Sequence, residues 1–146
     1  MRRARHLFKA ALGWPSLQRR AAELGLEAAE LMRFVGLEKY IEARADSMPY
    51  GALKRLEIAR ALATDPKLLL LDEPTAGMNP QETRQAEDLI FRIRDLGLAV
   101  LVIEHDMRFI FNLCDRVCCL VRGEVLVEGP GSVVQTDPRV IEAYIG

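Results

Sequence analysis

The fold is decided by residues 67–74, which read Lys67-Leu68-Leu69-Leu70-Leu71-Asp72-Glu73-Pro74. A short, unbroken apolar run that ends in two acids predicts a parallel strand buried on both faces. In open α/β sheets, ligands bind outside the carboxyl ends of the strands. We therefore expect Asp72 and Glu73 beside a polar crevice, where the first acid can hold Mg²⁺ and the second can orient or deprotonate a water. The alternative is a buried strand that ends in a solvated Asp-Glu turn.

A helix is predicted directly after this strand. Asn79 is a good N-cap, Pro80 suits the first helical position, and Glu82 completes a capping-box pattern. Gly97 ends the helix. The residues that recur with helical spacing and should form its buried stripe are Ala86, Leu89, Ile90 and Ile93.

A second buried strand, Leu98–Ile103, ends in the polar residues Glu104-His105-Asp106. The two strands should be parallel with a right-handed crossover, so their carboxyl ends share one edge of the sheet. His105 is then expected beside Asp72 and Glu73. A lone histidine after a strand is usually a surface or capping residue, but the shared edge favours a catalytic or phosphate-sensing role.

Three helices are predicted between residues 16 and 65. The first runs from about 17 to 35, capped by Ser16 and ended by Gly36, and the second covers residues 37–44. The first has an apolar stripe at Leu24, Ala28, Leu31 and Val35. The third opens at a Pro49-Tyr50-Gly51 turn and ends before Asp65-Pro66. N–H groups at its start form an anion site that Gly51 lets a phosphate approach; a capped amphipathic helix is the simpler alternative.

The remainder predicts a short helix, a hairpin and a final helix. Asp106 caps a helix through Phe111, and residues 116–121 and 124–127 pair through a turn at Arg122-Gly123. Residues 129–131, Gly-Pro-Gly, form a second turn. The final helix starts at Asp137-Pro138. Its side chains expected to pack on the core are Val140, Ile141 and Tyr144.

Composition places the chain among ordinary globular proteins. It has 146 residues, half of them hydrophobic and 28% charged, with a net charge of -1, so nothing global indicates a nucleic-acid or anionic-membrane partner. The basic residues 1–12 predict a surface helix rather than a membrane anchor or secretory signal. The three cysteines lack metal-ligand spacing and are interpreted as reduced core residues of a cytoplasmic protein.

The order of these motifs resembles the ATP-binding subunit of an ABC transporter over nearly the whole chain. Met48 to Ala52 stand at the family's signature motif, and Leu68 to Glu73 look like its Walker B strand with the catalytic glutamate. Ala76 to Asn79 are similar to the D-loop, and His105 to the switch histidine. Ala-Gly-Met-Asn-Pro, Ile-Glu-His-Asp-Met and the ending Ile-Glu-Ala-Tyr-Ile-Gly look most like subunits that drive branched-chain amino acid uptake.

The resemblance implies an α/β, partial P-loop NTPase fold in which parallel core strands are flanked by helices. Residues 1–146 would be one partial domain, with the helical subdomain and signature helix in 1–64 and the Walker B core, hairpin and last helix in 65–146. The implied cofactors are ATP and Mg²⁺, with Asp72 as metal ligand and Glu73 and His105 as catalytic residues. The residues that would contact nucleotide are Asp72, Asn79, Met48, Pro49, Tyr50, Gly51 and Ala52. The implied partners are transmembrane permease subunits and a second ABC ATPase subunit, at the inner face of the cell membrane.

The chain departs from the family pattern in several places. Pro49 and Tyr50 replace the usual signature serine and first glycine, Ala52 replaces a glutamine, and Asn79 replaces the common D-loop aspartate. No glycine is followed by lysine, so the phosphate-binding P-loop is missing from this sequence.

The missing loop leads us to expect the C-terminal portion of such a subunit, inactive and poorly soluble or partner-dependent on its own. The alternative is a non-catalytic truncated module that pairs with a complete ABC subunit or with the permease. A soluble ABC ATPase without a transport role is a third possibility.

Overall fold

The computed structural model describes residues 15–144, and the chain divides into two compact units after Asp65. The predicted surface helix at residues 1–12 lies outside the described residues. Within the described part, no helix has the length and apolar character needed to cross a membrane.

The first unit is helical. It contains α2 (Pro15–Phe34), two 3-10 turns, η1 (Glu38–Tyr40) and η2 (Ala45–Ser47), and α3 (Tyr50–Leu62), with α2 in contact with α3. Gly36 ends α2 as predicted: its φ is +71°, and the Leu37 N–H donates to the Met32 carbonyl at 2.7 Å.

Three predictions for this unit are wrong. Because α2 begins at Pro15, Ser16 lies inside the helix instead of capping it. The predicted stripe is buried only at its end: Leu24 and Ala28 are exposed, Leu31 is half-buried and Val35 is buried. The helix expected over residues 37–44 is replaced by η1 and η2, because a segment of two turns gains too few hydrogen bonds to offset helix nucleation.

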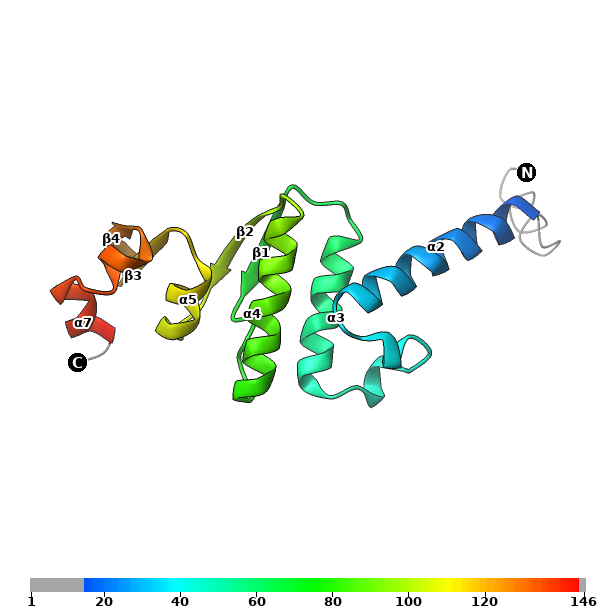
Figure 1. Ribbon diagram of the computed structural model, residues 1–146, viewed down its shortest axis with the longest axis horizontal. Coiled ribbons are helices and arrows are strands. Elements are labelled where there is room, and N and C mark those ends of the chain that lie inside the picture. The colour runs from blue at the N-terminus through cyan, green and yellow to red at the C-terminus, as the bar shows by residue number, and fades with distance from the viewer. Residues whose placement is uncertain (1–14, 145–146) are drawn as a thin grey trace, which may run out of the picture. The chain divides into compact units, whose positions relative to one another are not determined.

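The second unit begins with a parallel pair of strands. β1 (Leu68–Asp72) pairs with β2 (Ala99–Ile103) in a register that sets Leu68 opposite Ala99 and Asp72 opposite Ile103. Between them, α4 (Pro80–Asp95) packs against β2 (Figure 1). The capping box at its start and the buried stripe, both predicted, are confirmed.

β1 and β2 bury only one face of their sheet. Leu69 and Leu71 are buried, whereas Leu70 and its partner Leu101 are 65% and 54% exposed. Leu68 and Ile103 lie on the same exposed face. The prediction of burial on both faces is therefore wrong for this chain, because nothing among the described residues covers the second face.

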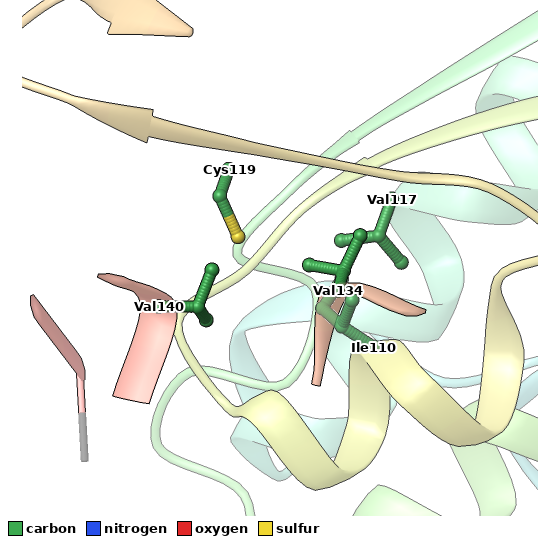
Figure 2. Packing of buried hydrophobic residues seen from close by; sticks show 5 residues of the cluster. All are labelled: Ile110, Val117, Cys119, Val134 and Val140. Carbon is green, nitrogen blue, oxygen red and sulfur yellow. The ribbon is translucent and has the colours of Figure 1, made fainter. Parts of the chain in front are cut away.

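The rest of the second unit is a hairpin with three short helices. Its elements are α5 (Met107–Leu113), β3 (Val117–Val121), β4 (Glu124–Gly129), α6 (Gly131–Val134) and α7 (Pro138–Tyr144). Arg122 and Gly123 have φ values of +52° and +85°, so the predicted two-residue turn is confirmed. Figure 2 shows the core that the hairpin shares with the helices. Its buried members are Ile110, Val117, Cys119, Val134 and Val140.

Some details of this part differ from expectation. Gly131 begins α6, so the Gly-Pro-Gly stretch ends β4 and starts a helix instead of forming a simple turn. Ile141 and Tyr144 are exposed, and of the three side chains expected to pack from α7 only Val140 is buried. Cys118 is also exposed, because strand alternation turns it away from the core that holds Cys119.

Candidate functional site

The carboxyl ends of β1 and β2 are joined by the backbone of Glu73. Its N–H donates to the Ile103 carbonyl at 2.8 Å, which extends the parallel ladder by one bond. Its φ of +45° is uncommon for a residue other than glycine, and it makes the chain leave the strand in a sharp turn. The turn keeps the Glu73 side chain at the edge of the sheet, more than half exposed.

Glu73 and His105 lie side by side at this edge, as parallel pairing predicts. The Nδ1 atom of His105 is 3.5 Å from Oε1 of Glu73, and the two side chains are 74% and 55% exposed. They form an ion pair only when the imidazole is protonated. Both groups are thus open to a ligand that approaches from solvent.

Asp72 occupies the last position of β1, on the exposed face of the sheet. It alternates with Leu68 and Leu70, so its side chain emerges on their side, and the residue is exposed. Among residues 15–144, no three His, Cys, Asp or Glu side chains are grouped so that they could hold a metal ion by themselves. A single carboxylate still fits Mg²⁺, which is usually held by one or two carboxylates together with water and substrate phosphates.

Glu104 is the functional candidate that the sequence analysis did not single out. Its side chain is only 1% exposed, and its Oε1 accepts from the N–H and the hydroxyl of Thr75, at 2.9 and 2.5 Å. Its Oε2 accepts from the His105 N–H at 3.2 Å and lies 3.7 Å from His105 Nδ1. Strand alternation could have found it, since it places Glu104 on the same side as Val100 and Val102.

The five residues of the predicted signature motif lie at the start of α3, in the first unit. Pro49 is the N-cap and no side chain caps the helix. Pro49 and Tyr50 are exposed, and Lys54 Nζ lies 5.8 Å from the centre of the Tyr50 ring. Met48, Gly51 and Ala52 are buried. The N–H groups of Met48 and Ala52 donate to the Ala45 and Pro49 carbonyls, at 3.2 and 3.0 Å, so neither is free for an anion. Pro49 and Tyr50 are the part of the motif that faces solvent.

Asn79 is occupied by its capping role. Its side-chain oxygen accepts from the N–H groups of Gln81 and Glu82, at 2.9 and 3.0 Å. In return, the Glu82 carboxylate accepts from the Asn79 N–H at 3.0 Å. The residue is exposed, and its carbonyl oxygen accepts from the N–H and the hydroxyl of Thr83, at 2.9 and 3.1 Å.

Sequence comparisons relate the chain to known proteins. The sequence pattern of the ABC transporter family matches residues 3–76. The high-affinity branched-chain amino acid transport ATP-binding protein LivG of Escherichia coli is 38% identical over 96% of this chain and 55% of its own length. The methionine import ATP-binding protein MetN of Caulobacter vibrioides is 43% identical over 76% of this chain and 34% of its own.

A solved structure gives the same result. MJ1267, an ATP-binding cassette of an ABC transporter, matches 85% of this chain and 51% of its own length, with 30% identity and a TM-score of 0.78. The chain thus spans about half the length of LivG and of MJ1267, and about a third of MetN. The identity, the coverage and the shared fold agree, and the chain belongs to the ABC transporter family.

Proposed function

We propose that this chain corresponds to the C-terminal portion of the ATP-binding subunit of an ABC importer. Residues 1–64 would supply part of the helical subdomain with the signature helix, and residues 65–146 the Walker B strand, hairpin and last helix. The observation that carries the proposal is the pairing of Glu73 with His105, 3.5 Å apart at the shared carboxyl edge of two parallel strands.

Each residue at that edge has a role that its position supports. Asp72 would provide one oxygen ligand to Mg²⁺. Glu73 would orient the attacking water and accept its proton, and His105 would donate a hydrogen bond to the terminal phosphate. Bound Mg²⁺-ATP supplies the phosphoryl group and the charge neutralisation that dominate this class of reaction. Asn79 and the backbone N–H groups of Tyr50 and Gly51 would contact nucleotide at the interface with a second ATPase subunit.

The substrate class is proposed from the relatives. Similarity to the E. coli branched-chain amino acid protein extends over 96% of the chain, whereas similarity to the methionine import protein extends over 76%. We therefore favour branched-chain amino acids. The partners would be transmembrane permease subunits and a second ATP-binding subunit, with the chain at the cytoplasmic face of the membrane.

The proposal is tested by supplying what the chain lacks. Alone, the chain should release no phosphate from ATP above background, because it has no P-loop to position the nucleotide. Mixed with the part of E. coli LivG that it does not match, it should hydrolyse ATP. Glu73→Gln should abolish that turnover, and Glu128→Gln, at an ion pair on the hairpin, should not. Turnover that survives Glu73→Gln would overturn the proposal.

A non-catalytic role is the second candidate, and the exposed face of the β1–β2 sheet favours it. Apart from Asp72 at the end of β1, that face is apolar and offers a surface on which a complete ABC subunit or permease could dock. In this role the chain would lend its signature helix to the partner's ATP site. Phosphate release by a complete subunit should then rise when the chain is added.

The signature helix can be probed with one glycine variant and a control for the added charge. Gly51→Asp places a carboxylate in the first turn of α3, where acids favour a helix but would repel a phosphate. Gly25→Asp adds a carboxylate at an exposed position in the middle of α2, where nothing lies within 4 Å, and controls for the added charge. Because Gly51 is buried, circular dichroism must show that Gly51→Asp keeps its helices. Loss of the stimulation with Gly51→Asp alone would support the non-catalytic role, and no stimulation by the parent chain would exclude it.

A further inference from the structure

Glu104 connects the two turns that carry the candidate site. We propose that Glu104 is a positioning residue, which holds the turn bearing Glu73 and Thr75 against the turn bearing His105. This inference rests on the proposed function, because it concerns how Glu73 and His105 are placed for that reaction.

The burial of Glu104 requires a reason. A carboxylate that is removed from water loses much hydration free energy unless hydrogen-bond donors replace the lost solvent. Glu104 has three such donors: the Thr75 N–H, the Thr75 hydroxyl and the His105 N–H. Bonds to a charged acceptor are roughly twice as strong as neutral ones. The carboxylate therefore stabilises this one arrangement of the two turns.

Two backbone hydrogen bonds, one at Glu73 and one at Thr75, fix the position of Glu73. Its own N–H is held by the Ile103 carbonyl, and Thr75, two residues later, is held by Glu104. His105 is held by the same carboxylate through its backbone, and its Nδ1 lies 3.7 Å from Oε2. The 3.5 Å approach of His105 to Glu73 is thus set by a side chain that is almost fully buried. Because its side chain is buried against Thr75 and His105, Glu104 acts through these two neighbours.

Glutamine cannot replace Glu104 in this arrangement. Both oxygens of the carboxylate accept from backbone N–H groups, one from Thr75 and one from His105. A glutamine presents one oxygen and one NH₂ group, and the NH₂ group cannot accept a bond. In Glu104→Gln, one of the two backbone N–H groups must therefore lose its acceptor while the other keeps it.

Amide hydrogen exchange at single-residue resolution tests the inference on the chain itself. In Glu104→Ala the amides of both Thr75 and His105 should exchange roughly 10- to 100-fold faster than in the parent. In Glu104→Gln only one of them should. Thr75→Ser should keep the parent's protection, and Thr75→Val should lose part of it. Glu128→Gln, a surface glutamate on the hairpin, is the matched control and should change neither amide.

A second readout separates positioning from stability. The nuclear Overhauser contact between the His105 ring and the Glu73 side chain should be present in the parent and in Glu128→Gln, and absent in Glu104→Ala. The chain has only two histidines, so a His105→Asn variant assigns the signal. If the contact and both amide rates are unchanged in Glu104→Ala, the inference is wrong. If Glu104→Ala does not fold, Glu104→Gln decides: unchanged rates at both amides overturn the inference.

These measurements need no nucleotide. If no mixture that contains the chain hydrolyses ATP, the proposed function is wrong. The effect of Glu104 on amide exchange and on the His105–Glu73 contact can still be measured. Conversely, active mixtures combined with unchanged exchange in the Glu104 variants would contradict only the role of Glu104.

Discussion

The β1–β2 sheet and the β3–β4 hairpin are both two-stranded, but they are completed differently. In the hairpin, the inner face is closed by helices from the same unit, and Val134 and Val140 are fully buried against it (Figure 2). In the parallel sheet, the inner face is covered in the same way, by α4. Their outer faces are alike in exposure: Leu70 and Leu101 on one, Leu120 and Val125 on the other, all more than half exposed.

The same exposure has a different meaning in the two sheets. Antiparallel sheets commonly have one face in water, whereas parallel sheets occur almost only with both faces covered. The outer face of the hairpin is therefore close to complete, and the outer face of the parallel sheet lacks a covering layer. Each large apolar side chain left in water forgoes roughly 1.5–3 kcal/mol of stabilisation. The open face of β1–β2 is the weakest feature of the isolated chain.

The largest expected effect is on association. The parent chain should be poorly soluble and its apparent mass should rise with concentration, because exposed apolar strands pair with other chains. Leu70→Lys with Leu101→Lys replaces one cross-strand pair of the open face and should raise the soluble monomer several-fold, measured by sedimentation velocity. The matched change on the hairpin, Leu120→Lys with Val125→Lys, should have a much smaller effect.

This prediction fails if the parent shows a sharp thermal transition that is independent of concentration and belongs to a monomer. Equal gains from the two lysine pairs would contradict the comparison itself, since the hairpin would then be as incomplete as the parallel sheet.

The next effect is on stability and compares the two faces of β1. Leu71→Ala should lower the free energy of unfolding by about 2–5 kcal/mol, because it leaves a cavity in a buried face. Leu70→Ala should change it by less than about 0.5 kcal/mol, because the side chain is already in water. Urea titrations at low protein concentration measure both. A similar cost for the two variants would mean that the outer face is covered in the isolated chain.

The sequence could predict α4 fully and β1 only in part, because α4 depends on local signals and the burial of β1 depends on its neighbours. The cap at Asn79 and the stripe of α4 are local signals, set by residues a few positions apart. The run of four leucines in β1 is uniform, so it contains no alternation that would show which face is covered. Which leucines are buried depends on the neighbours available, and those are not encoded in the run.

The candidate site also has one feature that the sequence predicts and others that it does not. Parallel pairing is enough to predict that His105 lies near Glu73, because strand ends share an edge. The bonds between Thr75 and Glu104 join residues 29 positions apart, in two turns whose backbone geometry no local pattern specifies. The positive φ of Glu73 is one such feature.

The smallest expected effect is a pH dependence confined to the start of α7, in the hairpin region. The Arg139 side chain, with the Arg139 and Val140 backbone, lowers the pKa of Asp137 from 3.8 to about 2. The carboxylate lies 2.8 Å from Arg139 Nη2 and also accepts from the Arg139 N–H at 2.9 Å. A pKa that is lower in the folded chain means that the stabilisation is present at neutral pH. It is lost as the pH falls from 3.8 toward 2, where the folded carboxylate is protonated as well.

Asp137→Asn should therefore melt at a lower temperature than the parent at neutral pH. The difference between the two melting temperatures should shrink as the pH falls from 3.8 toward 2. Arg139→Ala removes the main cause of the low pKa of Asp137. In this variant the melting temperature should depend less on pH in the same range. Both are measured against the parent, so the other acidic residues cancel in the comparison. Because the pair is at the surface, the effect should shrink when salt is added. Parallel acid profiles for the parent and both variants would show that Asp137 has no such role. The hairpin region would then be stabilised by its apolar core alone, and the covering of its inner face would be what distinguishes it from the open β1–β2 sheet.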